Sequence, residues 1–454
     1  MVPGMERAAA ARAPQRYHGE SLASKITLHW LIGVCLCLSF LLALLEFHYR
    51  SPNAQLTHVA LFCLAGLLVL CGRHRTERLQ GLFAGGGLLM TAVFFGEAIS
   101  YISHDTYSIT YGVVFILIIF SARLIVQEVG MPAIIRAYSQ AAILTVTFFL
   151  TFDLRKVLAG TSARFSGSSG VHPNLVGFIL GGFFPVIVWR ALEYKVRWKK
   201  RVAVFLAAMT FFIIFLTGSR GTLSAISTAG VLLVLRAVAF ERWLSRIRIG
   251  HSLIIAALVA TPMVMVLLVQ HNRIGHFLDF LVTTLQLNSS QRGINSGFSG
   301  RTYIWHITLN ILRAENRWLI GFGYRAGDRL VGTIDNGYIQ LLFESGLIAG
   351  SMILGSMIRV LVLTWKAAGL AQSGAWRRYY TALWCLMVIY FMNNVSTRYL
   401  FSFGSSFSLC VLCMMTWSRR ELVGAGTRKP APEPAAPARR AVRRELAWDR
   451  TGQF

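Results

Sequence analysis

Residues 107–127 read YSITYGVVFILIIFSARLIVQ, a largely apolar run in which Arg123 is the single charged residue. About 20 residues of this kind form a helix that crosses the hydrocarbon core of a bilayer. Similar runs centre on 27–46, 56–72, 79–97, 132–152, 174–192, 202–217, 222–240, 251–270, 338–363, 379–393 and 399–417. The sequence therefore predicts an all-α integral membrane protein with about twelve transmembrane helices.

The composition of the 454-residue chain agrees with lipid as the surrounding medium. The chain is 55% hydrophobic and 14% charged, whereas soluble domains are about 25% charged. A net charge of +26 could indicate a nucleic-acid partner. However, the Lys and Arg residues form short clusters between the apolar runs, and no basic RNA- or DNA-binding module is recognisable. We therefore expect membrane lipids and no nucleic acid as partners.

These Lys and Arg clusters also predict the orientation, because cytoplasmic loops are enriched in positive charge. A cytoplasmic N-terminus places the basic segments 73–78, 190–201, 236–248 and 366–378 on the inside. No cleavable signal peptide is visible, so the run 27–46 is expected to remain as the first helix. The predicted organisation is a cytoplasmic segment 1–26, a membrane domain 27–420 and a disordered cytoplasmic tail 421–454.

One predicted outer loop, residues 271–337 between the ninth and tenth helices, is long and carries several arginines. Loops of this length usually carry function or structure of their own. Within it, residues 301–314 have the apolar spacing of a helix that lies against a membrane.

The seven cysteines lie in or at the ends of apolar runs, including Cys410 and Cys413 with their CxxC spacing. A free cysteine behaves as a small apolar residue. We therefore predict a structural role for them, with neither a disulfide framework nor a metal site.

Arg220 lies in the turn Gly218-Ser219-Arg220-Gly221 between two apolar runs, on the side where positive charge is disfavoured. The glycines allow a tight turn and a close approach to a ligand. A charged residue held at such a boundary indicates a functional site. The alternative is a turn arginine bound to a lipid phosphate.

Arg301 opens the predicted loop helix, where a cation is unfavourable. We therefore expect a negative group near it, or else an ordinary solvated arginine. Arg325 follows Gly321-Phe322-Gly323. A dinucleotide-binding interpretation of these glycines is rejected, because no strand precedes them.

Asp335 precedes the tenth run, where it could act as a general base or could simply cap the helix together with Asn336. Glu344 lies inside that run, so it should face protein or water rather than lipid. His172 and Asn174 flank Pro173 at the start of the sixth run. Both a functional role and plain helix capping remain open for them.

Several arginines and one carboxylate, without clustered metal ligands, fit the binding of a phosphate-rich anion, because a guanidinium pairs with phosphate oxygens through two hydrogen bonds. At a membrane surface, that anion would be a lipid phosphate or pyrophosphate. Arginines would stabilise it as a leaving group.

The order of these motifs resembles the O-antigen ligase and Wzy-type polysaccharide polymerase superfamily. The resemblance covers the membrane region and is most specific from Gly218 to Gly350. The residues that carry it are His172-Pro173-Asn174, Gly218-Ser219-Arg220-Gly221, Gly300-Arg301 with Trp305, Gly321-Phe322-Gly323, Asp335-Asn336-Gly337-Tyr338-Ile339-Gln340 and Glu344-Ser345-Gly346-Leu347.

The resemblance implies a metal-independent, inverting glycosyltransferase with a GT-C-like membrane fold and no cofactor. Its donor would be a glycan on undecaprenyl pyrophosphate, used at the periplasmic face of the bacterial inner membrane. Its other partners would be an acceptor glycan or lipid A–core and a chain-length regulator protein. The implied catalytic residues are Asp335, Arg220 and Arg301, and the implied substrate-binding residues are His172, Asn174, Arg325, Asn336 and Glu344.

One position departs from the family pattern. Ligases of this family usually carry His where this chain has Asp335, which favours a polymerase of exopolysaccharide, capsule or O-antigen over a ligase. Two functions from other classes remain as alternatives. A transporter of lipid-linked glycans would place its charges near the bilayer midplane, and a structural scaffold would not need Arg220.

Overall fold

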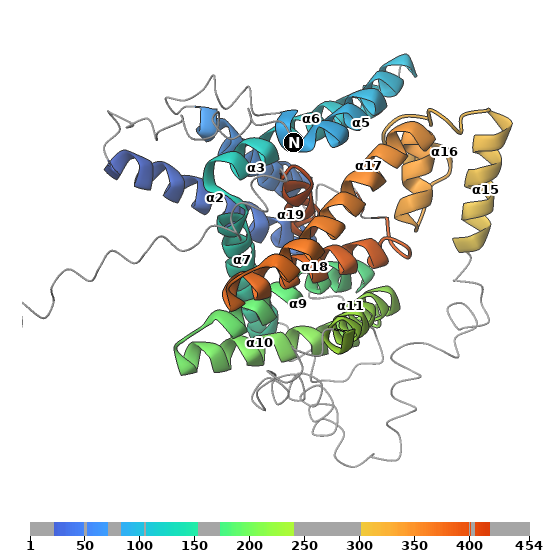
Figure 1. The fold of residues 1–454 in the computed structure, drawn as a ribbon. Helices are drawn as coiled ribbons and strands as arrows, with labels where there is room; N and C mark the ends of the chain where they lie inside the picture. The colour runs from blue at the N-terminus through green and yellow to red at the C-terminus, as the bar shows by residue number, and fades with distance from the viewer. Residues whose placement is uncertain are drawn as a thin grey trace, which may run out of the picture.

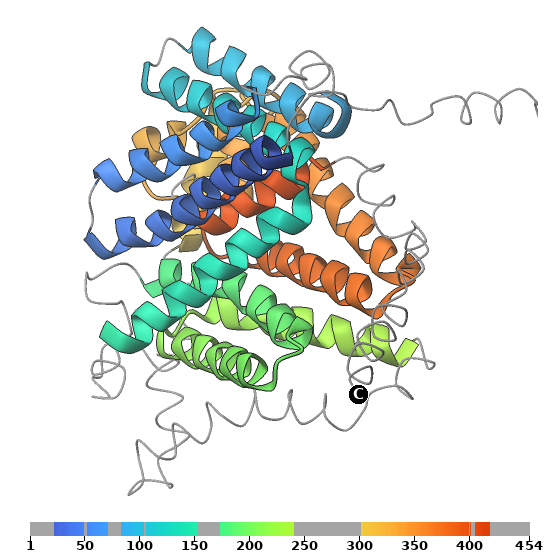
Figure 2. The same ribbon diagram turned by 90° about the vertical axis from the view of Figure 1, so that its left-hand side faces the viewer.

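The computed structural model describes residues 22–49, 52–70, 83–103, 106–152, 173–239, 301–398, 400 and 405–417, and every regular element in these ranges is a helix (Figures 1 and 2). The helices are α2 (Leu22–Tyr49), α3 (Pro52–Leu70), α5 (Phe83–Ile102), α6 (Thr106–Val129), α7 (Met131–Phe152), α9 (Pro173–Glu193), α10 (Arg197–Leu216), α11 (Arg220–Ala239), α15 (Arg301–Ala314), α16 (Ala326–Leu330), α17 (Gly337–Leu370), α18 (Gly374–Asn393) and α19 (Ser406–Met415).

These helices confirm the predicted class of multi-pass helical membrane protein. Each expected run coincides with a helix except 251–270, which lies outside the described residues. Within the described ranges, α6, α7, α9 and α17 are long and apolar enough to cross a membrane, and several other apolar helices are shorter. The figure of about twelve crossings stays a prediction, as do the segments 1–26 and 421–454, which the structure does not describe.

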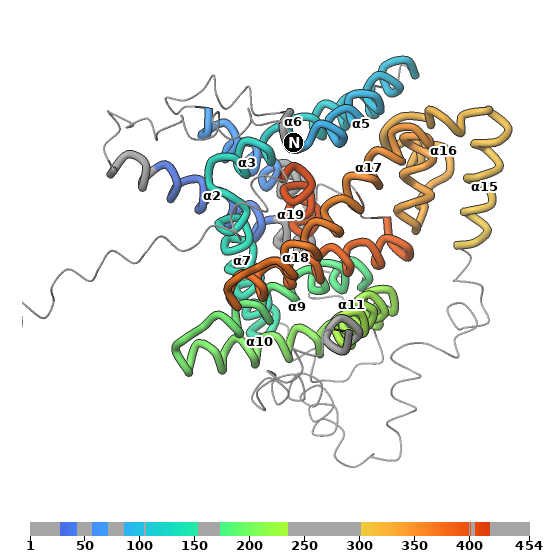
Figure 3. Tube along the Cα trace, viewed as in Figure 1, coloured from blue at the N-terminus to red at the C-terminus, as the bar shows by residue number. Residues whose placement is uncertain are grey.

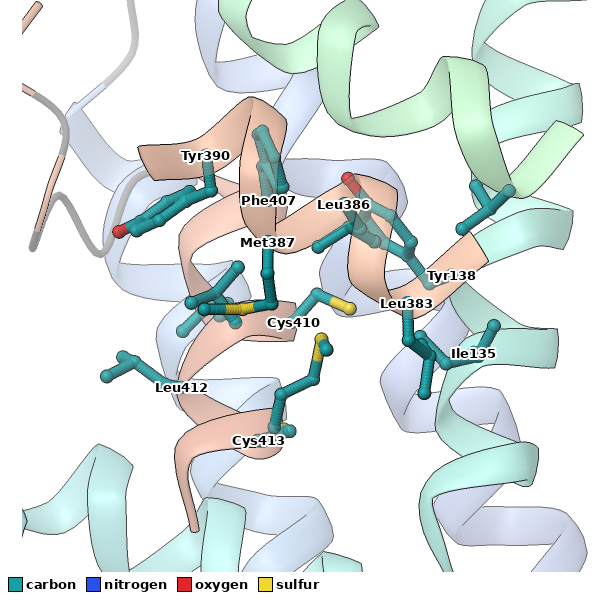
Figure 4. Close-up of a cluster of buried hydrophobic side chains, with 14 of the residues drawn as sticks. Ile135, Tyr138, Leu383, Leu386, Met387, Tyr390, Phe407, Cys410, Leu412 and Cys413 are labelled. Carbon is teal, nitrogen blue, oxygen red and sulfur yellow. The ribbon is translucent and has the colours of Figure 1, made fainter. Parts of the chain in front are cut away.

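The shortest of the apolar helices, α19, lies at the centre of the bundle. It contacts α6, α7, α9, α17 and α18, and every side chain from Ser405 to Trp417 is buried. Its cysteines Cys410 and Cys413 pack among Tyr138, Leu386 and Met387 (Figure 4). This packing confirms their predicted structural role.

At one end of the bundle, several contacts join segments that the charge distribution is predicted to place together on the cytoplasmic side. Arg378 pairs with Glu193 at 3.1 Å. Arg359 and Arg123 donate to the carbonyl oxygens of Met415 and Thr416, at 2.8 and 3.1 Å. Arginines are well placed there, because the last carbonyl groups of a helix lack partners within the helix. The predicted alternation of helix ends agrees with these contacts, and the absolute orientation stays a prediction.

The described part of the long loop packs beside α17 (Figure 3), at a point where this helix is broken. At Gly346 the backbone leaves the helical conformation, with φ 65° and ψ −175°. The preceding segment 318–323 fills the break. Phe322 and Gly323 donate backbone N–H groups to the carbonyl oxygens of Phe343 and Glu344, at 3.0 and 2.9 Å.

The other side of the break is held in the same way. The N–H groups of Leu347 and Ile348 donate to Trp318 and Leu319 at 2.8 and 3.1 Å. These four hydrogen bonds fasten the loop to the membrane helix. We call the paired segments 318–323 and 343–348 the clasp.

Tyr324, next to the clasp, inserts between α5 and α6. It is 3% exposed, its hydroxyl donates to the carbonyl of Val93 at 3.2 Å, and its ring packs edge-on against Phe115. Burial raises the pKa of Tyr324 well above its ordinary value, so the phenol keeps the proton that it donates. The clasp and this tyrosine together fix the chain that carries Arg325 and Asp335.

Candidate functional site

Arg301 is the first described residue of α15, and its guanidinium lies against the carboxylate of Asp335. The Nε atom of Arg301 is 3.3 Å from Oδ2 of Asp335, and Nη1 donates to the carbonyl oxygen of Ser396 at 3.2 Å. Asp335 is therefore the negative group that the sequence predicted near Arg301. Both side chains stay partly exposed, at 22% and 38%, so the pair remains open to a ligand.

The turn that carries Arg220 reaches the same place. Gly218 has φ +58°, and α11 begins at Arg220, whose side chain is exposed. Gly221 lies so close to Ser396 that an added Cβ would overlap with the Oγ atom of Ser396. The start of α11 and the guanidinium of Arg301 thus meet at Ser396.

The turn after α18, residues 393–398, connects the whole site. Thr222 pairs with Asn393 at 3.0 Å, and the backbone N–H of Gly337 donates to the carbonyl of Asn394 at 2.8 Å. The turn thus contacts the start of α11, the start of α17 and Arg301. Three helix ends that are far apart in sequence are held by one short segment.

Asn336 serves as the N-cap of α17, the helix-capping role that the sequence had left open for it. Its Oδ1 accepts hydrogen bonds from the backbone N–H groups of Tyr338 and Ile339, at 3.0 and 3.1 Å. This occupies the amide oxygen of Asn336, whereas Asp335, which is not the cap, faces Arg301.

Arg325 belongs to a neighbouring cluster and not to the Arg301–Asp335 pair. Its backbone is left-handed at φ 59°, its Nη1 lies 2.8 Å from Oδ2 of Asp328, and its guanidinium lies over the ring of Tyr111. Burial acts to lower the pKa of Arg325, but Tyr111, Glu344 and Asp328 outweigh it and raise the pKa, so the guanidinium stays charged.

Asp328 holds a second arginine as well. Nη1 of Arg398 lies 2.8 Å from Oδ1 of Asp328, so the two carboxylate oxygens bind one guanidinium each. Arg398 comes from the 393–398 turn. The ion pair therefore ties that turn to α16.

Glu344 faces protein, as expected from its place in an apolar run. It is 7% exposed and accepts a hydrogen bond from Nε2 of Gln340 at 2.8 Å and another from the backbone N–H of Arg325. A small pocket, partly open to solvent, lies beside it. The pocket is lined by Tyr111, Tyr324, Arg325, Gly337, Gln340, Leu341, Glu344, Arg398 and Leu400.

The start of α9 lies beside the Arg220 turn. Asn174 is in its first turn, and a Cβ on Gly177, one turn later, would overlap with Ser219. His172, the other residue expected there, lies outside the described residues. In the described part of the chain, no three His, Cys, Asp or Glu side chains are grouped as metal ligands.

The sequence motifs included Gln340, but they did not single out Arg398, Ser396, Asp328 or Tyr111 as site residues. The position of Arg398 in a short outer loop, where positive charge is unusual, was the available signal. Ser396, Asp328 and Tyr111 are of types common in helices and loops, so the sequence offered no signal for them.

The fold and this site define a class of protein, a multi-pass helical membrane protein with an arginine-rich site where several helices end. Residues 202–354, about a third of the chain, match the family model described as O-Antigen ligase, Wzy_C. No curated protein matched in the comparison. The chain thus carries the O-antigen ligase family region, whose members transfer glycans in polysaccharide and lipopolysaccharide biosynthesis. The matched region contains Arg220, Arg301, Asp335 and Glu344.

Proposed function

We propose that this protein polymerises oligosaccharide repeat units carried on undecaprenyl pyrophosphate. The repeat units would belong to exopolysaccharide, capsule or O-antigen, and the site would face the periplasm from the inner membrane. The observation that carries the proposal is that Arg301 contacts both Asp335 and Ser396, while Gly221, next to Arg220, packs against the same Ser396. Arg220, Arg301 and Asp335 all lie in the family region.

In this reaction, Arg220 and Arg301 bind the donor pyrophosphate. The N-terminal ends of α11 and α15 add to its binding, because helix N-termini carry partial positive charge. Asp335 takes the proton of an acceptor hydroxyl as the oxygen attacks C1 of the donor sugar. The bond from C1 to the pyrophosphate oxygen breaks, and the two arginines stabilise the negative charge that remains on the leaving group. One displacement of this kind inverts the configuration at C1, and no step of it calls on a metal ion.

The ion pair between Arg301 and Asp335 has a place in this scheme. Before the donor binds, each group neutralises the other. A bound pyrophosphate would offer Arg301 a stronger partner of higher charge and would release Asp335 toward the acceptor.

The ligase that passes a finished glycan to lipid A–core is the second candidate. Arg301 pairs with the carboxylate of Asp335 and not with an imidazole, and this difference separates the polymerase from the ligase. A carboxylate base is what favours the polymerase.

The first test is a deletion strain complemented with variants. Arg220→Ala and Arg301→Ala should each reduce polymer formation about a hundredfold or more, as the loss of one charge-stabilising donor typically does. Single repeats on the lipid carrier should accumulate, which mass spectrometry of lipid extracts would detect. The matched control is Arg313→Ala on the same helix α15, since Arg313 is exposed in the last turn.

The amounts of each variant in the membrane should be equal by immunoblot. Normal polymer from both Arg220→Ala and Arg301→Ala would refute the pyrophosphate site. Long polymer retained on the lipid carrier in the deletion strain would show that the lost activity is a ligase and not a polymerase.

A further inference from the structure

Exposed apolar side chains follow one side of α17. Leu347, Ile358 and Val362 are all exposed, and their spacing keeps them on the same side of the helix. Because α17 is long and apolar enough to cross a membrane, exposed apolar side chains along its length have lipid as their natural surroundings. We therefore assign this side of α17 to the lipid.

The break at Gly346 lies at one end of the part of α17 that fits the hydrocarbon core. The 19 residues 347–365 contain a single charged side chain, Arg359, and Lys366 follows them. About 20 residues of a helix cross the core. A helix that enters the core near Lys366 therefore leaves it at the break, and the clasp lies where α17 meets the membrane surface.

The clasp brings a residue of the long loop to the lipid-facing side of α17. The backbone N–H of Ile348 donates to the carbonyl oxygen of Leu319 at 3.1 Å, and the side chain of Leu319 is 60% exposed. Leu347 and Ile348, across the break, are exposed as well. We call Leu319, Leu347 and Ile348 the Leu319 patch. The patch joins the loop to the lipid-facing side of α17, and contiguous exposed apolar surface is typical of membrane contact.

Two exposed tyrosines lie beside the clasp, Tyr101 near the end of α5 and Tyr107 near the start of α6. Their neighbours in sequence hold the residue that follows the clasp. The Oγ atom of Ser100 accepts the backbone N–H of Tyr324 at 3.1 Å, and the hydroxyl of Ser108 donates to the carbonyl of Tyr324. Tyrosine is enriched where a bilayer meets water. The two tyrosines therefore agree with a membrane surface at the level of the clasp.

The helix that the sequence predicted to lie against the membrane, residues 301–314, uses its apolar side for another contact. Ile304, Leu309 and Leu312 belong to one hydrophobic cluster with Ile334 and Phe343. Protein thus fills the apolar side of α15. The apolar surface of the loop that adjoins the lipid-facing side of α17 is the Leu319 patch.

We propose that the Leu319 patch inserts into the acyl chains of the adjacent leaflet and anchors the long loop to the bilayer. The partner is lipid, because the patch continues a surface that lipid already covers. This inference is independent of the proposed function, since it concerns where the loop meets the membrane and not what the site transfers.

The test measures the quenching of a bimane fluorophore attached to Leu319→Cys, in the purified full-length protein in phosphatidylcholine nanodiscs. Phosphatidylcholine with a nitroxide on its acyl chain should quench most of the fluorescence, and iodide in the water should quench little. Glu315→Cys, an exposed position earlier in the same loop, is the matched control and should show the opposite pattern. Unmodified protein treated with the same reagent gives the background from the seven native cysteines.

Ile348→Cys, on the helix side of the patch, is the second variant and should be quenched in the same way as Leu319→Cys. Strong quenching of Leu319→Cys by iodide and not by the lipid nitroxide would overturn the proposal. Quenching by neither reagent would also overturn it, because a protein surface such as a second copy of this chain would then cover the patch. Lipid quenching of Ile348→Cys alone would mean that α17 contacts the acyl chains without the loop, which contradicts the anchor.

Discussion

At the scale of single residues, the chemistry of the site depends on which carboxylate each arginine meets. Arg301 meets Asp335 at 3.3 Å, and Arg325 and Arg398 both meet Asp328 at 2.8 Å. Since Asp328 already binds two guanidinium groups, Asp335 is the carboxylate better placed to accept a proton. We therefore assign the role of general base to Asp335.

Asp335→Asn should reduce turnover by about a hundredfold or more, because the amide cannot accept the acceptor proton. The affinity for undecaprenyl pyrophosphate should stay equal or rise, because Arg301 loses its competing partner. Transfer rates and dissociation constants measured on the same preparation would separate these effects. The control is Glu315→Gln, an exposed carboxylate that follows α15.

A parallel loss of turnover and of pyrophosphate affinity would contradict the base role. It would mean that Asp335 acts only by orienting Arg301.

At the scale of helices, the clasp connects the loop to the membrane helix. Gly346 adopts φ 65° and ψ −175°, a region that residues other than glycine avoid. An added Cβ there would overlap with the backbone of Leu319 and Ile320. Arg325 and Asp335 lie between segment 318–323, which pairs across the break, and the start of α17. The break in α17 therefore determines the position of the backbone that carries both side chains.

Gly346→Ala should therefore lower the free energy of unfolding by about 1–3 kcal/mol from backbone strain alone. The melting temperature of the purified protein in detergent should fall by several degrees, and glycan transfer should fall with it. Gly355→Ala on the same helix is the control. Its Cβ would only reach ordinary contact with Leu88, and alanine favours a helix over glycine.

If Gly346→Ala melted at the temperature of Gly355→Ala, the clasp could not be a strained and necessary feature of the fold.

At the scale of the whole molecule, two sets of contacts lie at opposite ends of the bundle. One end joins Arg378 to Glu193 and places Arg359 and Arg123 on the end of α19. The other end holds the site. Predicted inner segments contact one another, and predicted outer segments do likewise, so the bundle has two chemically distinct ends.

The orientation can be tested by labelling with a membrane-impermeant maleimide. Asn316→Cys, after α15, should be labelled in intact spheroplasts. Lys195→Cys, between α9 and α10, should be labelled only after lysis, because both positions are exposed and the predicted topology places them on opposite sides of the membrane. The unmodified protein is the control for its seven native cysteines. The reverse pattern would invert the orientation, and labelling of both from one side would refute the two-ended arrangement.

The sequence by itself determined the helical class and the positions of the described helices, and it predicted the outer side of the membrane for Arg220, Arg301 and Asp335. Hydrophobic runs and basic clusters are local features, and the bilayer acts on each of them independently. The sequence also predicted that Arg301 needs a negative neighbour, because a cation at a helix start is unfavourable.

Only the tertiary structure decided which neighbour that is. The partners Asp335 and Ser396 lie 34 and 95 positions away from Arg301, and Asp328 and Arg398 are separated by 70. Such pairs form where helices pack together, and the pattern of one segment does not contain the position of another. The break at Gly346 was equally hidden, since glycine inside an apolar run also fits an unbroken helix. The helices and their ends follow from local solvation, whereas the site follows from packing.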